Sequence, residues 1–256
     1  MGILKPLGTT SILVSPIALG TVKFGRNQGV KYPTAFDLPQ DTDIKNLLSL
    51  CQELQINFLD TAAAYGLSEE RIGKLLTHRQ QWVISTKAGE EFQDGKSYYD
   101  FSPKHIRRSV ERSLRCLKTD YLDLVLIHSD GNDEKIIHET DSLQTLHQLK
   151  EAGYIRALGM STKTMAGGLQ ALTLCDAVML SYNPLYTEEL PVLEAAYAQQ
   201  KGILIKKGLL SGHLGQLKHE DPIQHCLDFI FAQPAVTSLV VGTINSAHLQ
   251  EISTKL

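Results

Sequence analysis

Four side chains that can hold or move a proton stand at, or just beyond, the ends of short apolar runs. Asp60, Lys87 and His128 each close such a run, and Tyr65 follows Asp60 by five residues. Each has an ordinary structural explanation: an aspartate can cap a helix, a lysine can be its ion-pair partner, and a lone histidine is usually a hydrogen-bonded core residue. Because all four occupy the same kind of position, we predict that they form one catalytic group.

This group suits proton transfer to a carbonyl oxygen. A phenol such as Tyr65 is a weak acid, with a reference pKa of about 10, and a neighbouring ammonium group lowers that pKa. Asp60 would keep Lys87 charged and oriented, and the imidazole of His128 can hydrogen-bond a substrate oxygen. General acid catalysis of this kind typically accelerates a reaction about 10²- to 10⁴-fold.

The apolar runs that position these residues alternate with longer amphipathic stretches, which we predict to be helices. Ser102 and Pro103 suit the N-cap and first position of a helix that ends at Leu117, and Ser68, followed by two acids, is expected to cap another. A further helix is expected over Glu139–Gly153. The eight predicted strands are Ile17–Gly20, Ile56–Asp60, Trp82–Lys87, Tyr121–His128, Tyr154–Gly159, Ala177–Tyr182, Gly202–Lys206 and Ser238–Gly242.

Alternation of strand and helix predicts an α/β fold with a parallel sheet. Two observations favour a closed (β/α)8 TIM barrel over an open doubly wound sheet. The chain has no G-x-G fingerprint, and polar residues follow several different strands, as in barrel active sites. We expect one barrel domain over residues 1–256, with a hairpin at Leu4–Ser15 closing the barrel floor.

The residues around the catalytic group resemble the aldo-keto reductase family, and the resemblance extends from about Leu7 to Leu249. It implies a (β/α)8 barrel, NADPH as the usual cofactor with NADH as an alternative, and reversible reduction of aldehydes and ketones by hydride transfer. It also makes Tyr65 the general acid, assisted by Lys87 and Asp60, with His128 orienting the carbonyl. The matching segments are Phe58–Gly66, Ser68–Gly73, Ile84–Lys87, Ser113–Leu117, Leu124–His128, Gly153–Arg156 and Leu158–Ser161.

The chain departs from the family where the nicotinamide is held. The usual Ser-Asn pair after the fifth strand is Ser161-Thr162 here, and a glutamine of the sixth strand is replaced by Met179. Lys206 stands where an aromatic side chain usually stacks on the nicotinamide. A lysine has no stacking face, so we expect Lys206, with Lys207, to contact the pyrophosphate as a point charge.

Further cofactor contacts are expected at the ends of the first and eighth strands. Thr21 and Val22 follow the first strand. The eighth is followed by a turn and a helix start, whose free N–H groups suit a phosphate. His248 aligns with an arginine that family members use for the 2′-phosphate. The residues expected in this turn are Gly242, Thr243, Asn245 and His248.

Composition excludes several other classes of function. The formal net charge of −3 over 256 residues gives no basic excess for nucleic acid, and no run is long enough to span a membrane. The four cysteines form no C-x-x-C pair, so we expect reduced thiols, no metal site and a cytoplasmic protein. The N-terminus has no unbroken apolar segment of a signal peptide, and the resemblance implies a monomer that acts on a small-molecule carbonyl substrate.

Two other functions fit part of this pattern. His128, Asp130 and Asp133 could be ligands of a hydrolase metal, but no second histidine joins them and Lys87 would repel a cation. A regulatory or sensor protein that binds nucleotide with little turnover is the alternative that the altered nicotinamide contacts keep open. We also expect an open, shallow substrate site. Its candidate wall is the Lys23–Pro39 loop, with Phe24, Arg26 and Tyr32.

Overall fold

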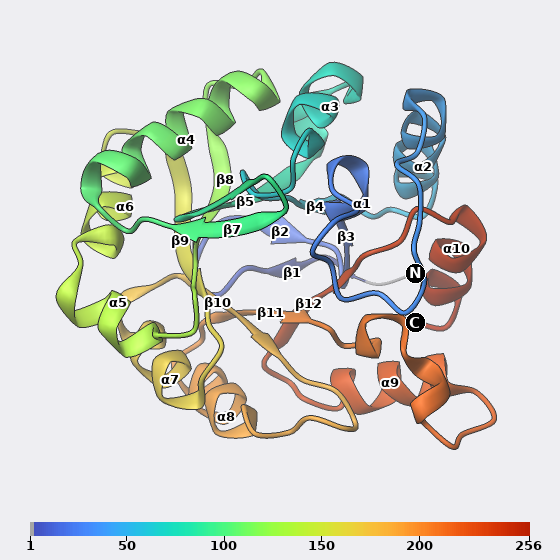
Figure 1. Ribbon diagram of the computed structural model, residues 1–256. Helices are drawn as coiled ribbons and strands as arrows, with labels where there is room; N and C mark the ends of the chain where they lie inside the picture. The colour runs from blue at the N-terminus through green and yellow to red at the C-terminus, as the bar shows by residue number, and fades with distance from the viewer. Residues whose placement is uncertain (1–2) are drawn as a thin grey trace.

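The computed structural model describes residues 3–256 and shows a closed parallel barrel surrounded by helices (Figure 1). Neighbouring strands are hydrogen-bonded all the way round, from the first barrel strand to the eighth and back. This confirms the predicted (β/α)8 fold, and each predicted strand agrees within two residues at either end. In order around the barrel, the strands are β3 (Ile17–Gly20), β4 (Phe58–Asp60), β5 (Val83–Ala88), β8 (Leu122–His128), β9 (Ile155–Ser161), β10 (Ala177–Ser181), β11 (Gly202–Lys206) and β12 (Val236–Val241).

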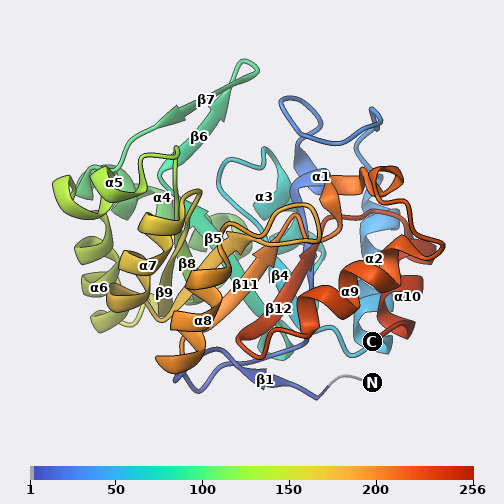
Figure 2. The same ribbon diagram turned by 90° about the horizontal axis from the view of Figure 1, so that it is seen from below.

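Helices cover the outside of the barrel and follow the strands in sequence (Figure 2). Two helices, α5 and α6, lie between β8 and β9. The α-helices are α1 (Val22–Gly25), α2 (Asp41–Glu53), α3 (Ser68–Leu75), α4 (Pro103–Leu117), α5 (Asp133–Glu139), α6 (Ser142–Glu151), α7 (Met165–Leu174), α8 (Leu190–Ala198), α9 (Pro222–Phe231) and α10 (Ser246–Thr254), with short 3₁₀ turns at Arg79–Gln81, Leu210–Gly212 and Leu214–Gln216.

The predicted starts of three of these helices agree with the structure to different degrees. Ser102 caps α4 as expected, because its hydroxyl accepts a hydrogen bond from the His105 N–H. Ser68 does not cap α3 and is already its first residue. Its hydroxyl donates to Thr21 and pairs with Thr61, so it ties the helix to the barrel instead. The helix expected over Glu139–Gly153 begins three residues later, at Ser142.

Two apolar layers hold the fold together, as the alternation of side chains along a strand requires. One layer lies between the strands and the helices. The other fills the barrel interior and is formed by Ala18, Phe58, Val83, Leu124, Leu126, Ala157, Ala177, Met179 and Leu204, together with Leu7, Ile12 and Val14 from the N-terminal segment. The interior is therefore packed, and a ligand cannot pass through the barrel.

The N-terminal segment closes the other end. β1 (Lys5–Pro6) and β2 (Leu13–Val14) form an antiparallel hairpin below the barrel (Figure 2). Leu7 is fully buried and belongs to the interior cluster. This confirms the predicted floor hairpin and leaves the carboxyl ends of the strands as the mouth.

A second hairpin, which the sequence analysis did not predict, stands at the mouth. β6 (Glu90–Gln93) and β7 (Lys96–Tyr99) pair antiparallel directly after β5 and project from the end opposite the floor hairpin (Figure 2). The turn is Asp94-Gly95, and both residues have positive φ. Asp-Gly is the preferred sequence for such a two-residue turn, so this was the signal that could have revealed the hairpin.

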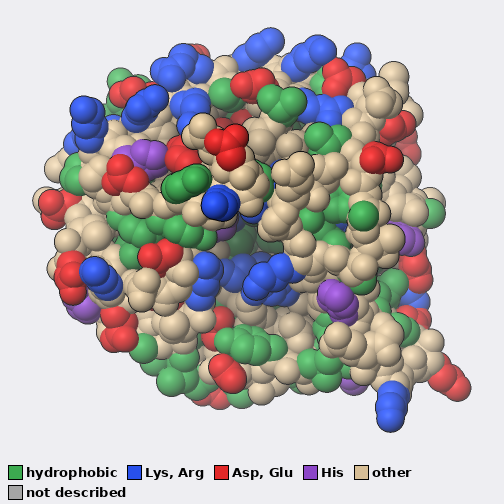
Figure 3. All heavy atoms as spheres, viewed as in Figure 1, with side chains coloured by type: hydrophobic (Ala, Val, Ile, Leu, Met, Phe, Trp, Pro, Cys, Tyr) green, Lys and Arg blue, Asp and Glu red, His purple; other side chains and the backbone are tan. Residues whose placement is uncertain are grey.

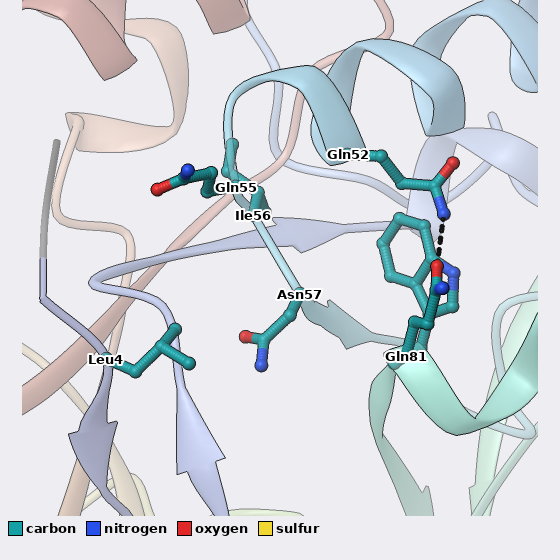
Figure 4. Close-up of a pocket in the computed structure, with 7 residues that line it drawn as sticks. Leu4, Gln52, Gln55, Ile56, Asn57 and Gln81 are labelled. Carbon is teal, nitrogen blue, oxygen red and sulfur yellow. Dashed lines mark hydrogen bonds between the residues drawn. The ribbon is translucent and has the colours of Figure 1, made fainter.

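A hollow on the outside of the molecule lies at the floor end and not at the mouth (Figure 4). It is lined by residues that precede β4 and β5, with Leu4 from the N-terminal segment. The Gln52 amide donates to Gln81 across it at 3.0 Å. None of the predicted site residues lines this hollow, so it lies apart from the candidate site.

Candidate active site

The barrel register brings three of the four predicted catalytic residues to the mouth. Asp60 pairs with Ser85 on β5, Lys87 with Leu126 on β8, and His128 with Ser161 on β9. Each lies two or four residues after a side chain of the same strand that points into the barrel. These side chains are Phe58 for Asp60, Val83 for Lys87 and Leu126 for His128. Side chains two apart lie on the same face of a strand, so all three point into the barrel opening.

Asp60 and Lys87 form a buried ion pair. The Lys87 Nζ lies 2.8 and 2.7 Å from the two carboxylate oxygens of Asp60 and donates a third bond, of 2.8 Å, to the Thr61 carbonyl. Both residues are at most 3% exposed. Burial is the largest single influence and lowers the pKa of Lys87, but Asp60 and Tyr65 together outweigh it, so the net direction of the pKa is upward. The ammonium group therefore stays charged.

Tyr65 reaches this pair from the loop after β4, with its ring centroid 5.0 Å from the Lys87 Nζ. The loop is fixed by a backbone contact between two glycines. A Cβ on Gly66 would lie 2.2 Å from the Gly25 carbonyl oxygen, and a Cβ on Gly25 would lie 2.2 Å from the Ser68 nitrogen. Neither position has room for a side chain, so α1 and the Tyr65 loop are held together by glycine.

The net pKa shift of Tyr65 differs from the one expected. Burial raises the pKa of the phenol and is the largest influence, whereas the Lys87 ammonium lowers it. The predicted effect of Lys87 therefore has the correct sign, but desolvation is larger and the net direction is upward. The hydroxyl of Tyr65 thus remains protonated at neutral pH in the free protein, as a proton donor must be.

His128 faces Tyr65 edge-on, with ring centroids 6.2 Å apart and planes at 81°. Its Nδ1 lies 2.8 Å from Oε2 of Glu90, a residue of β6 that the sequence analysis did not single out. Burial lowers the pKa of His128 despite the opposing effect of Glu90. Burial alone would raise the pKa of Glu90, but contact with His128, Ser97 and Arg26 lowers it to about 2.

Lys206 lies deeper in the mouth than a surface loop would place it. Its Nζ donates to the Ser161 hydroxyl at 2.9 Å and to the Thr162 carbonyl at 2.6 Å. Burial and the nearby Lys207 lower the pKa of Lys206 to about 7, against the opposing effect of Glu189. Three residues predicted to hold the cofactor, Ser161, Thr162 and Lys206, are thus brought together.

The other residues of this predicted shell are placed differently. Thr162 is fully buried, and its hydroxyl has no hydrogen-bond partner among the described residues. Met179 lies in the barrel interior and contributes its carbonyl to the Thr162 N–H. Thr21 is buried and donates from both its N–H and its hydroxyl to the Asp60 carbonyl, with the half-buried Val22 next to it.

The turn after β12 is partly self-satisfied. The Asn245 side chain accepts hydrogen bonds from the N–H groups of Ala247 and His248, and the Thr243 hydroxyl accepts one from the Asn245 N–H. The expected free N–H groups at the start of α10 are therefore capped in part by Asn245 itself. A Cβ on Gly242 would lie 2.3 Å from the Tyr32 hydroxyl, so the Lys23–Pro39 loop reaches across the mouth to this turn.

That loop forms one side of the opening, although not through all the residues expected. Phe24 is fully buried in the core and cannot face a substrate. Arg26 lies over the Phe92 ring at 3.4 Å and within 3.5 Å of Glu90, so it links the loop to the β6–β7 hairpin. Tyr32 lies under Lys23, whose Nζ is 3.9 Å from the ring centroid.

Side chains of lysine or arginine, blue in Figure 3, border the hollow at the centre of this face. Burial lowers the pKa of Lys207 most, and the positive charges of Lys31 and Lys163 lower it further. Burial also lowers the pKa of Lys206 most, with Lys207 and Lys163 adding to the effect. These four side chains, called the lysine rim below, give the mouth a local positive potential that suits an anionic ligand.

No cluster of histidine, cysteine and acidic side chains within residues 3–256 could hold a metal ion. Asp133, a candidate metal ligand from its sequence position, has structural partners instead. One oxygen contacts the Ser129 hydroxyl, and the other accepts from Thr164 and from the Lys163 N–H. The four cysteines are free thiols, and no helix within the described part of the chain is long and apolar enough to cross a membrane.

A packed (β/α)8 barrel with an aspartate, a tyrosine, a lysine and a histidine at its mouth is the arrangement of a barrel oxidoreductase. Residues 16–217 match the model of the aldo/keto reductase family. The chain therefore belongs to the aldo/keto reductase family and is an NAD(P)H-dependent oxidoreductase. Enzymes of this family use nicotinamide cofactors and act on small-molecule substrates.

Similar proteins agree with this assignment. The solved structure of a putative aldo-keto reductase from Pseudomonas aeruginosa is 47% identical, with a TM-score of 0.90, and the match covers 99% of this chain and 94% of that one. An uncharacterized oxidoreductase of Bacillus subtilis, YqkF, is 28% identical over 96% of this chain and 89% of its own length. An NADH-specific methylglyoxal reductase of Escherichia coli is 32% identical over 60% of this chain and 50% of its own length.

Proposed function

We propose that the protein reduces aldehydes or ketones, with Tyr65 as the general acid and NADPH as its usual cofactor. The observation that carries this proposal is the buried Asp60–Lys87 pair beside the Tyr65 ring, at the open end of a packed barrel. When bound, the nicotinamide supplies the hydride. The protein supplies the proton and the environment in which it moves.

Each residue of the group has a distinct task in this scheme. Tyr65 donates its phenolic proton to the carbonyl oxygen as negative charge develops there. Lys87 stabilises the phenolate that remains, because its ammonium group favours the ionised phenol. Asp60 holds the Lys87 ammonium in place with both carboxylate oxygens. His128, on the other side of the opening, orients the substrate oxygen.

The residues around this group fit a nicotinamide dinucleotide. The unpaired buried hydroxyl of Thr162 and the nearby Ser161 offer polar partners for a carboxamide, and the lysine rim offers charge for phosphates. We propose that the cofactor is held by Thr21, Val22, Ser161, Thr162, Met179, Lys206, Lys207, Gly242, Thr243, Asn245 and His248. Because the related methylglyoxal reductase is described as NADH-specific, both dinucleotides belong in the test.

The test compares the wild type with Tyr65→Phe. Fluorescence titrations with NADPH and NADH should show binding to both proteins, with NADPH the tighter ligand. Oxidation of NADPH by a reactive aromatic aldehyde should fall about 10²- to 10⁴-fold in the variant. The substitution removes the hydroxyl that touches the reacting oxygen but leaves the lysine rim unchanged. Turnover should therefore fall while dinucleotide binding is kept.

Two results would change the proposal. Tight dinucleotide binding without Tyr65-dependent turnover would favour a sensor or regulatory protein. Tighter binding of NADH would reverse the cofactor preference but leave the chemistry intact. We further propose that the protein is a monomer, which sedimentation of the purified protein would check. We also propose that it accepts a broad range of aldehydes. Sharp selection within a panel of aldehydes that differ in bulk would contradict this.

A further inference from the structure

Lys206 carries a nucleophilic nitrogen at the mouth that the proposed chemistry does not use. It is the last residue of β11 and lies two residues beyond Leu204, whose side chain fills the barrel interior. Because side chains two apart lie on the same face of a strand, the Lys206 amine points into the same opening as Lys87 and His128. Its charge lowers the pKa of His128. Lys206 is half-buried, so a small molecule in the opening can reach it.

The contacts of the Lys206 nitrogen suit a neutral amine. Nζ lies 2.9 Å from the Ser161 hydroxyl and 2.6 Å from the Thr162 carbonyl oxygen. The carbonyl requires one N–H, whereas a hydroxyl can either donate or accept, so an uncharged amine satisfies both contacts. Within residues 3–256, no carboxylate forms an ion pair with Lys206, in contrast to the Asp60–Lys87 pair.

The surroundings of this nitrogen disfavour its protonation. Burial is the largest influence and, with the charges of Lys207 and Lys163, lowers the pKa of Lys206 to about 7. Glu189 and Asp133 act in the opposite direction. A desolvated lysine beside another cation is the arrangement that activates an amine as a nucleophile. Much of Lys206 is therefore uncharged at neutral pH, whereas an ordinary lysine, with a pKa of about 10.4, is almost wholly protonated.

Glu189 is a second buried group near this amine that the proposed chemistry leaves unassigned. It precedes α8 and is 1% exposed. One carboxyl oxygen accepts from the Ser181 N–H at 3.4 Å, and Ser181 pairs with Lys206 across β10 and β11. The other oxygen has no hydrogen-bond partner among the described residues. Burial raises the pKa of Glu189 to about 7, so a protonated carboxyl is available near the neutral amine.

We propose that Lys206, in the protein free of dinucleotide, is a nucleophile that condenses with aldehydes to form a reversible imine. This inference rests on the proposed function, which admits aldehydes to this opening. The nitrogen lone pair attacks the carbonyl carbon, and one nitrogen-bound proton moves to the oxygen to give a carbinolamine. The C–O bond then breaks as the C=N bond forms, and the hydroxyl leaves with the second proton as water. Nothing is oxidised or reduced in this step.

The imine has a consequence for cofactor binding. Lys206 is also one of the residues proposed to hold the dinucleotide, so the same nitrogen cannot serve both ligands. Aldehyde that reaches the free protein first should therefore delay cofactor binding. Bound dinucleotide should in turn protect the amine from aldehyde.

Reduction with borohydride tests the imine directly. Protein without cofactor is incubated with benzaldehyde at pH 7.5 and then treated with sodium borohydride, which converts the C=N bond into a stable secondary amine. The product gains the mass of the aldehyde less one oxygen atom, and tandem mass spectrometry locates it. We expect about tenfold or more modification of Lys206 relative to Lys201, which bonds the Cys175 carbonyl at the other end of β11. Modification of Lys206 no greater than that of Lys201 and the exposed lysines would overturn the proposal.

Three variants separate an activated amine from an accessible one. Lys206→Arg keeps a positive charge without the nucleophile and should lose the modification at this position. Lys207→Met keeps the nucleophile but removes a charge that disfavours its protonation, so modification of Lys206 should fall several-fold. Lys201→Met is the matched control and should leave Lys206 as reactive as in the wild type. Equal reactivity of Lys206 in the Lys207→Met variant and the wild type would contradict activation by the neighbouring charge.

Turnover provides an independent readout through the order of addition. Wild-type protein that receives benzaldehyde before NADPH should start several-fold more slowly than protein that receives NADPH first. Lys206→Arg should show no difference between the two orders. Equal initial rates in the wild type would refute the exclusion of dinucleotide by the imine. Absence of turnover in every protein would contradict the proposed carbonyl reduction, whereas the borohydride result decides the imine without any turnover.

Discussion

At the scale of single residues, two lysines of the same mouth are held in opposite ways. Lys87 makes three bonds, two of them to a carboxylate, and its pKa is raised. Lys206 makes bonds only to a neutral hydroxyl and a carbonyl, and its pKa is lowered to about 7. The first charge is therefore permanent at working pH, whereas the second is lost as the pH rises.

The buried Asp60–Lys87 pair predicts an asymmetric response to mutation. Lys87→Met leaves Asp60 charged and unpaired in the barrel, so the free energy of unfolding should fall by about 3–5 kcal/mol. The double variant Asp60→Asn/Lys87→Met removes both charges and should recover most of that loss. Urea unfolding of the three proteins measures this, with Lys74→Met, from a surface pair, as the control. Equal losses in the single and double variants would contradict a buried charge penalty.

The lowered pKa of Lys206 predicts pH-dependent binding of dinucleotide. A lysine is positive below its pKa, so the ammonium is present at pH 6 and mostly lost by pH 8.5. Affinity for NADH, which lacks the titrating 2′-phosphate, should therefore fall about tenfold across this range. Fluorescence titration of Lys206→Met should show weaker binding without that fall.

Other charged groups lie near Lys206, so the difference between Lys206→Met and the wild type decides the result. Glu189, Asp133, Lys163 and Lys207 are all close enough to influence its pKa, and they remain in the variant. Lys201→Met is the matched control: Lys201 precedes the same strand at the opposite end of the barrel and bonds the Cys175 carbonyl. An identical pH dependence in Lys206→Met and the wild type would assign the effect to another group.

At the scale of elements, the barrel could be predicted from the sequence because its strands are short, largely apolar runs and most of them carry a polar residue at or next to the carboxyl end. The floor hairpin was also predictable, since Leu7 and Val14 are apolar residues on either side of Gly8. The β6–β7 hairpin was missed because the partly buried β6 and the exposed β7, unlike the barrel strands, carry no apolar pattern.

Missing that hairpin also meant missing Glu90. A carboxylate beside another carboxylate in a polar segment looks like a solvated surface, and its burial depends on Arg26 and His128, which lie far away in the sequence. The same limitation applied to Phe24, which was expected at the substrate wall but packs in the core. The ends of strands can be predicted from the local sequence pattern. Contacts between loops depend instead on how the strands close into a barrel.

The link between the Lys23–Pro39 loop and the hairpin predicts a local change in flexibility. Arg26 contacts the ring of Phe92, the carboxylate of Glu90 and the carbonyl of Ala64. Arg26→Ala should increase amide exchange in both segments by roughly tenfold, since a cation–π contact and an ion pair together contribute about 1 kcal/mol or more. Hydrogen–deuterium exchange measures this, and the barrel strands should remain unchanged.

Arg108→Ala provides the comparison for that experiment. Arg108 is an exposed residue of α4, so its loss removes a similar side chain without touching the mouth. Faster exchange in both variants would indicate general destabilisation. No change in Arg26→Ala would mean that Arg26 does not hold the two segments together.

At the scale of the whole molecule, charge is distributed unevenly. The chain carries a formal net charge of −3, yet the lysine rim gathers positive charge at the one end where the barrel is open (Figure 3). The packed interior and the floor hairpin close the other end. An anionic dinucleotide is thus repelled weakly by the molecule as a whole and attracted by its mouth.

These two influences predict opposite effects of salt on the association rate. If net charge dominated, added salt would screen repulsion and speed the binding of NADPH. Steering by the lysine rim predicts the reverse, because salt screens local attraction over about a Debye length, roughly 10 Å at 0.1 M. Stopped-flow fluorescence between 20 and 300 mM NaCl should show the rate constant falling several-fold.

Two lysine variants separate the lysine rim from net charge. Lys207→Gln should lower the association rate at low salt and flatten its salt dependence. Lys45→Gln changes the net charge equally from the exposed face of α2 and should behave like the wild type. Equal effects of the two substitutions would show that net charge, and not its placement at the mouth, controls capture of the cofactor.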